Sequence, residues 1–162
     1  MADFPFDEHF PNRVKSTAER YFRSNLFNCA ETVLKAVLEE SGMPCPLETV
    51  RLASAFGRGM GGAGCCCGAL VGGQMAIGAL FGRTQETGFP PEGCAILSKQ
   101  LYDRFVQHNR ATCCRILHKG LPFGTPEQFD ACAIRAACAA EITAQVIREA
   151  IMEKFPLSTG TE

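Results

Sequence analysis

The sequence predicts an all-α protein, a single-domain bundle of five or six helices around a buried central helix rich in glycine and cysteine. Apolar residues recur at helical spacing along most of the chain. No useful length alternates with a period of two, and clusters of β-branched residues are absent. The 162 residues, 46% of them apolar, are enough for one core. We therefore expect one domain over residues 1–162, with loosely ordered ends at 1–11 and 156–162.

The first half of the chain contains signals for three helices. Residues 12–24 carry apolar side chains on one face and basic side chains on the other. Asn28 is followed three residues later by Glu31, the capping-box pattern, so a second helix is expected over 29–40. A shorter helix is expected over 47–56. The second helix should bury four residues: Val33, Leu34, Val37 and Leu38.

A glycine-rich turn leads into the predicted central helix, residues 65–81. Small residues recur there every four positions, which lets another backbone approach closely: Gly64, Gly68, Gly72 and Ala76. Residues 59–82 contain no charge, which raises the question of a membrane span. Repeated glycine and the central Gln74 make that segment a poor span, so we expect a buried helix.

The second half is predicted to contain a loop over 83–93, a helix over 95–107 and a long final helix over 126–154. Thr112 is expected to cap a short turn, and Thr125 with Pro126 marks the start of the final helix. The final helix should bury four residues: Ile134, Cys138, Ile142 and Val146.

Composition and charge narrow the class of protein. The formal net charge is −1, and the Lys and Arg residues are scattered, so nucleic acid is not an expected partner. The first ten residues lack both a basic start and a long apolar run, so we expect a cytoplasmic protein. Thiols are kept reduced in that compartment. The ten cysteines are therefore not interpreted as a disulfide framework.

The cysteines contain no C-x-x-C pair, yet several fall at predicted helix starts: Cys29, the run 65–67 and the pair 113–114. Backbone N–H groups and the helix dipole favour a thiolate at such positions. Three consecutive helical residues point about 100° apart, so burial in one core does not explain the run 65–67. Burial does suffice for three others taken singly: Cys45, Cys94 and Cys138.

A longer pattern joins these cysteines. Residues 67–72 read Cys-Gly-Ala-Leu-Val-Gly and fit a C-G-A-x-x-G motif. The motif lies between Asn-Cys-Ala at 28–30 and Thr-Cys-Cys-Arg at 112–115. Cys132 follows, seven residues before Ala-Ala-Glu at 139–141. The pattern is similar to that of the redox-active family named for its C_GCAxxG_C_C motif.

The resemblance extends over about residues 18–147 and implies redox activity. Carried over residue by residue, it implies a four-cysteine set, Cys29, Cys67, Cys114 and Cys132, with Gly68, Ala69 and Gly72 completing the motif. Three neighbours in the same runs are weaker candidates for the site: Cys65, Cys66 and Cys113.

Three functions fit four cysteines that come from separate helices. The first is a 2Fe–2S iron–sulfur cluster for electron transfer or redox sensing, since four thiolates are the usual ligand set. The alternatives are a cluster-free thiol–disulfide redox protein and a four-cysteine module for zinc or another soft metal. A helical interaction module whose cysteines merely pack is the fourth interpretation.

Little else in the sequence indicates chemistry. His118 near Cys114 offers a Cys–His couple, although we favour a solvated His at a helix end. No catalytic constellation beyond the cysteines is present, so enzymatic activity stays open. The expected partners are a redox partner protein and a second copy of the chain in a homodimer. Membrane association is expected only through an associated transporter.

Overall fold

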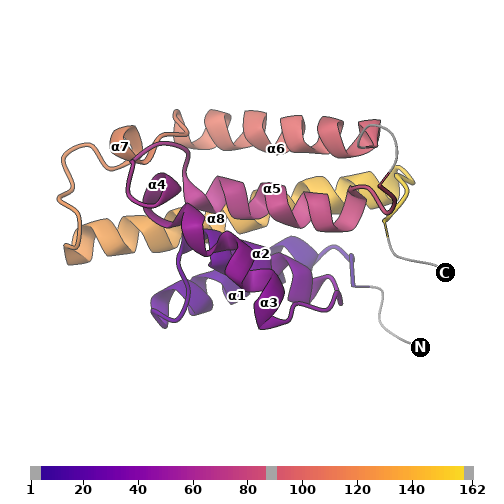
Figure 1. The fold of residues 1–162 in the computed structure, drawn as a ribbon, viewed down its shortest axis with the longest axis horizontal. Coiled ribbons are helices and arrows are strands. Elements are labelled where there is room, and N and C mark those ends of the chain that lie inside the picture. The colour runs from indigo at the N-terminus through magenta and orange to yellow at the C-terminus, as the bar shows by residue number, and fades with distance from the viewer. Residues whose placement is uncertain (1–4, 87–90, 159–162) are drawn as a thin grey trace.

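The structure, a computed structural model, describes residues 5–86 and 91–158. Five long helices form one bundle: α1 (Phe10–Arg23), α2 (Cys29–Glu40), α5 (Gly68–Phe81), α6 (Glu92–Asn109) and α8 (Pro126–Met152) (Figure 1). The described residues contain no strand, only one isolated antiparallel bridge between Cys66 and Cys113. The all-α prediction is confirmed.

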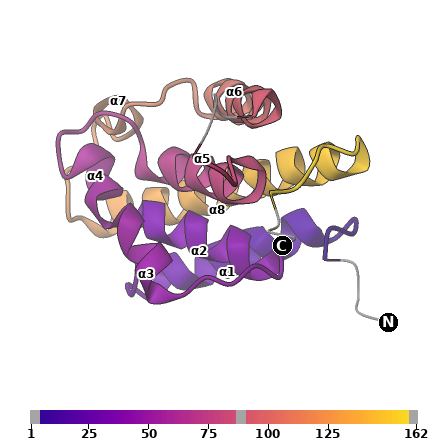
Figure 2. The same cartoon turned by 45° about the vertical axis from the view of Figure 1, so that its right-hand side comes forward.

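Short helical segments complete the bundle: α3 (Leu47–Val50), the 3₁₀ helix η1 (Arg51–Phe56), α4 (Gly57–Met60) and α7 (Cys114–Leu117). The helix expected over 47–56 is thus divided into a turn of α-helix and a 3₁₀ segment. Both views place α4 and α7 beside each other at one end of the bundle (Figures 1 and 2).

The long helices pack in layers around α5 and α8. Helix α1 packs on α2 and α8, α2 packs on α5, and α6 covers the other side of α5 and α8 (Figure 2). Helix α5 is apolar almost all round, as expected of a central helix. The face of α8 toward the core consists largely of alanine, which lets several helices approach it: Ala133, Ala136, Ala137, Ala139, Ala140, Ala144 and Ala150.

Side-chain caps fix where two of the long helices begin. Asn28 Oδ1 accepts hydrogen bonds from the N–H groups of Ala30 (2.9 Å) and Glu31 (3.1 Å). The Glu31 carboxylate accepts in return from the Asn28 N–H (2.8 Å), which completes the predicted capping box. At the start of α8, Thr125 Oγ1 accepts from the Gln128 N–H (3.3 Å). All four residues expected to be buried in α2 are in the core.

Several predicted boundaries differ from the structure by two or three residues. Helix α5 begins at Gly68 rather than at residue 65, because residues 65–67 are extended and pair with the chain before α7. Helix α6 begins at Glu92, so the loop expected over 83–93 is shorter, and its residues 87–90 lie outside the described part. Helix α8 ends at Met152, just before Lys154 adopts a positive φ of 62°.

One predicted core residue is wrong. Ile134 is 57% exposed, whereas Ile142 and Val146 are buried and Cys138 is half-buried. The buried stripe of α8 passes instead through Ala133 and its alanine neighbours, so the larger Ile134 faces outward. Hydrophobicity alone did not distinguish these adjacent positions.

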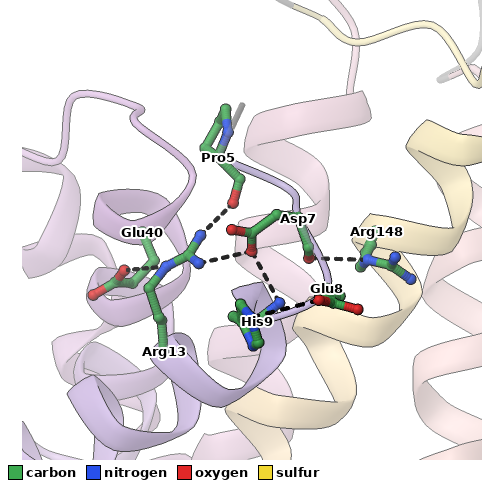
Figure 3. A network of polar contacts seen from close by, with 7 residues as sticks. All are labelled: Pro5, Asp7, Glu8, His9, Arg13, Glu40 and Arg148. Atoms are coloured by element: carbon green, nitrogen blue, oxygen red, sulfur yellow. Dashed lines mark hydrogen bonds and ion pairs between the residues drawn. The ribbon is translucent and has the colours of Figure 1, made fainter. Parts of the chain in front are cut away.

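Hydrogen bonds attach the described residues near both ends of the chain to the bundle, and the loosely ordered ends expected over 1–11 and 156–162 stay a prediction. Arg13 donates to Asp7 Oδ1 (2.7 Å) and to the Pro5 carbonyl (2.5 Å), and Arg148 Nε donates to the Asp7 carbonyl (3.0 Å) (Figure 3). This network ties the segment before α1 to α8. At the other end, the Ser158 N–H donates to the Leu80 carbonyl (2.6 Å) at the end of α5.

Glycine allows α5 to approach α2 closely. A Cβ atom on Gly72 would collide with the carbonyl oxygen of Ala30, and one on Gly68 would lie 2.7 Å from that of Phe56. Ala76 is fully buried one turn further along. Within α5 the predicted stripe of small residues is therefore a packing surface, whereas its first member, Gly64, lies in the turn before the helix and faces Arg115. None of the described helices combines the length and the apolar character that a membrane span needs.

Replacing Gly72 by Ala should destabilise the protein by about 1–3 kcal/mol, because the added methyl group pushes α5 away from α2. Urea unfolding followed by far-ultraviolet circular dichroism measures this change. Gly78→Ala is the matched control, since no atom lies within 4 Å of its Cβ position and alanine is the better helix former by up to about 1 kcal/mol. Equal stability of the two variants would contradict the packing described.

Candidate functional site

The structure brings four cysteines from four helical segments to one cavity. Cys29 is the first residue of α2, Cys67 is the N-cap of α5, and Cys114 is the first residue of α7. Cys132 lies in the second turn of α8. All four line a cavity of about 320 Å³, whereas the weaker candidates Cys65, Cys66 and Cys113 do not line it.

The remaining walls of the cavity combine aromatic and cationic side chains. Aromatic rings come from α1, from the loop before α2, from the loop before α8 and from α8 itself: Phe22, Phe27, Phe123 and Phe129. Arg58 and Arg135 supply two positive charges, and the Arg58 guanidinium lies 4.4 Å from the centre of the Phe123 ring. The cavity therefore offers apolar walls together with groups that favour anions.

Backbone pairing places Cys67 next to Cys114. The Cys67 N–H donates to the Thr112 carbonyl (2.7 Å), and the Cys114 N–H donates to the Cys65 carbonyl (2.8 Å). The turn before this pairing needs glycine, since Gly59 has a φ of +68° and a Cβ there would lie 2.9 Å from Cys114 Sγ. The glycine-rich turn therefore lets α4 close over the Cys114 thiol.

Cys67 is the most acidic thiol of the four. The Cys114 thiol donates a hydrogen bond to Cys67, and this bond lowers the pKa of Cys67 to about 7 although burial opposes the shift. The N–H groups of Ala69 and Leu70 at the start of α5, together with the charge of Arg135, lower it further. The same hydrogen bond raises the pKa of Cys114. Near neutral pH a substantial fraction of Cys67 is therefore thiolate, while Cys114 stays a thiol.

The pKa of Cys29 shifts in the opposite direction, although Cys29 also begins a helix. Burial raises the pKa of Cys29 to about 12, and the neighbouring Cys67 thiolate adds to the effect. Backbone N–H groups of Arg58 and Ala30 offset only part of this increase. The expectation that helix starts favour thiolates is therefore right for Cys67. It is wrong for Cys29, where the effect of burial on the pKa exceeds that of the helix start. It is also wrong for Cys114, where the hydrogen bond that its thiol donates to Cys67 has the larger effect.

Cys132 contacts a histidine. Its Sγ lies 3.2 Å from His118 Nε2, and Gln128 Nε2 donates to the same sulfur (3.0 Å). Arg135 also lies 3.2 Å from His118 Nε2 and can only donate, so we assign the lone pair to Nε2 and the Cys132 S–H as a donor to it. Burial lowers the pKa of His118 and raises that of Cys132, which keeps both groups neutral.

The interpretation of His118 as a solvated histidine is wrong. Its side chain is half-buried in the cavity wall, and its sulfur partner is Cys132 rather than the nearby Cys114.

Sequence reasoning also missed both arginines. Arg135 had a usable signal, because it lies three residues after Cys132 and so on the same face of a helix. Arg58 had none, since a backbone φ of +57° orients it.

The other cysteines lie elsewhere. Cys45, Cys94 and Cys138 are half-buried and pack against the core, in agreement with a simple packing role. Within residues 5–86 and 91–158, no group of three or more His, Cys, Asp or Glu side chains is disposed to hold a metal ion. The four cavity cysteines thus share one space without forming a preassembled ligand set.

Fold and site define a class: a helical protein with four thiols in one cavity, one of them acidic. A family model described as "Putative redox-active protein (C_GCAxxG_C_C)" matches residues 27–146, and the chain belongs to this family. The resemblance seen in the motif at 67–72 is confirmed. Comparison with curated proteins found no match, and comparison with solved structures found none either.

The hydrogen bond from Cys114 should be measurable in the ionisation of Cys67. In Cys114→Ala the donor is lost, so the pKa of Cys67 should rise from about 7 toward or above that of an ordinary thiol. Cys114→Ser keeps a donor and should leave the pKa low. Ultraviolet absorbance of the thiolate against pH, corrected with Cys67→Ser, gives both values. A midpoint that stays near pH 7 in Cys114→Ala would show that Cys114 has no part in the shift.

Proposed function

We propose that this chain is a thiol–disulfide redox protein, with Cys67 as the attacking thiolate and Cys114 as the resolving thiol. The observation that carries the proposal is the backbone pairing that places Cys67 beside Cys114 in one cavity, where the Cys114 thiol lowers the pKa of Cys67 to about 7. A thiol attacks disulfides best when its pKa lies near the ambient pH, because the thiolate is then both populated and nucleophilic. The family's redox character supports the same conclusion.

The reaction is an exchange with a disulfide substrate, R–S–S–R′. The Cys67 thiolate attacks one sulfur, a mixed disulfide forms with the R group, and R′S⁻ leaves and takes up a proton. The Cys114 thiol then loses its proton to solvent and displaces RS⁻, which is protonated in turn. The substrate gains two electrons and becomes two thiols, while Cys67 and Cys114 become a disulfide.

The rest of the cavity supports substrate binding. A volume of about 320 Å³ is at the lower end of ligand pockets and suits the end of a small disulfide or one segment of a partner protein. Arg58 and Arg135 favour a substrate that carries negative charge and stabilise the leaving thiolate. The cytoplasmic location, the redox partner protein and the homodimer stay predictions from the sequence.

A 2Fe–2S cluster is the second candidate, favoured by the convergence of four cysteines on one cavity. Four thiolates are a ligand set that a cluster would accept, and the two arginines would offset its negative charge. Its four ligands would be Cys29, Cys67, Cys114 and Cys132. The described side chains are not disposed as a ligand group, and Cys132 must leave His118 to join one. Exchange between thiols needs no such rearrangement, so we rank it first. Zinc binding by the same four thiols would require the same movement of Cys132 away from His118.

A redox titration tests the exchange directly. In a Cys65→Ser, Cys66→Ser, Cys113→Ser background, oxidation by a small disulfide should join the tryptic peptides 59–83 and 111–115 through Cys67 and Cys114. Mass spectrometry after alkylation detects the link. Adding Cys67→Ser should abolish it, and Cys114→Ser should instead accumulate a mixed disulfide at Cys67. A variant that stays helical yet forms no link at any potential would refute the proposal.

Metal analysis distinguishes cluster binding, the second candidate, from thiol exchange. Protein purified without oxygen should contain no stoichiometric iron, acid-labile sulfide or zinc, and its alkylated mass should show free thiols at all four cavity cysteines. A content of about two iron and two sulfide ions per chain, with both lost in Cys29→Ser and in Cys132→Ser, would contradict thiol exchange and support cluster binding. Stoichiometric zinc without sulfide would favour the four-cysteine metal module instead.

A further inference from the structure

Cys66 and Cys113 form a pair that the cavity does not use. The isolated antiparallel bridge places them directly opposite each other, one from the segment before α5 and one from the segment before α7. The two flanking hydrogen bonds run from Cys67 to Thr112 and from Cys114 to Cys65, so the bridge itself lies between them. This is the non-hydrogen-bonded type of antiparallel pair.

The extended backbone sorts the cysteines onto two faces. Cys67 and Cys113 both have extended backbone angles, with ψ values of 127° and 126°. Successive side chains of an extended chain point to opposite faces, so Cys66 and Cys113 share the face away from Cys67 and Cys114. The cavity lining agrees, since it includes Cys67 and Cys114 but neither Cys66 nor Cys113.

Non-hydrogen-bonded pairs have the closest facing side chains in an antiparallel ladder. Their Cα atoms are about 4.5 Å apart, which falls within the range that disulfides span. Both cysteines are free and half-buried, so a small reagent can reach them. The spacing of this backbone pair therefore permits a disulfide between Cys66 and Cys113.

We propose that Cys66 and Cys113 form a second, separate redox site, a reversible cross-link between the segments that lead into α5 and α7. A low-molecular-weight disulfide is the oxidant. One cysteine attacks it and forms a mixed disulfide, and the other displaces the remaining thiol. Two electrons pass to the oxidant, both protein thiols lose their protons, and two small thiols are released.

The cross-link acts on the cavity through the backbone. It fastens the pairing that places Cys67 beside Cys114, yet it leaves both of those sulfurs free because they lie on the other face. Oxidation at Cys66 and Cys113 would thus stabilise the cavity without consuming its thiols. This second site does not depend on the exchange at Cys67, and the experiment below therefore uses a variant in which Cys67 and Cys114 are both replaced.

The test uses the full chain with Cys65→Ser, Cys67→Ser and Cys114→Ser. Oxidised glutathione should join tryptic peptides 59–83 and 111–115, which then contain only Cys66 and Cys113. Closing this loop should raise the Tm by roughly 5–15 °C, and dithiothreitol should reverse the increase. The matched control adds Cys66→Ser, which should show neither the link nor the shift in Tm.

Other outcomes overturn the proposal. A helical variant that forms no link, or that joins Cys66 or Cys113 to a different cysteine, shows that the bridge is not a redox pair. If the triple variant fails to fold, fragmentation of the linked peptides from the unmodified protein identifies the joined residues. A link there only between Cys67 and Cys114 would remove this proposal and leave the exchange reaction intact.

Discussion

Three backbone hydrogen bonds join the segment before α5 to the start of α7 and the residues that lead into it, and the arrangement of the cavity depends on them. They place Cys67 beside Cys114, which lie far apart in the sequence, and at the same time turn Cys66 and Cys113 to the opposite face. A single short pairing therefore determines which thiols share the cavity. Without it, the start of α5 and the start of α7 would have no fixed relation, because α7 is only one turn long.

The balance between burial and hydrogen bonding assigns different chemistry to similar cysteines. Cys29 and Cys67 both lie at helix starts, Cys67 buried and Cys29 half-buried. At Cys29 the loss of hydration dominates, so the thiol stays protonated. At Cys67 the donated hydrogen bond from Cys114 and the start of α5 outweigh that loss, so the thiolate is favoured near neutral pH. Position at a helix start is thus insufficient to make a cysteine reactive.

Local patterns in the sequence predicted much of this molecule. Asn28 with Glu31 and Thr125 with Pro126 marked helix starts, because capping depends only on neighbours in the chain. The glycine stripe indicated the approach of another helix. The extended form of residues 65–67 was not predictable, since its hydrogen bonds go to a segment far along the chain. The contact of His118 with Cys132 escaped prediction for the same reason, as it requires α7 and α8 to be packed.

The most direct test of a thiolate at Cys67 is the rate at which the reduced protein attacks a small disulfide, measured against pH. We predict that the rate rises with a midpoint near pH 7, set by the pKa of Cys67, and that Cys67→Ser removes this phase. A midpoint at the pKa of an ordinary thiol, or an unchanged phase in Cys67→Ser, would contradict the assignment of Cys67 as the attacking thiolate.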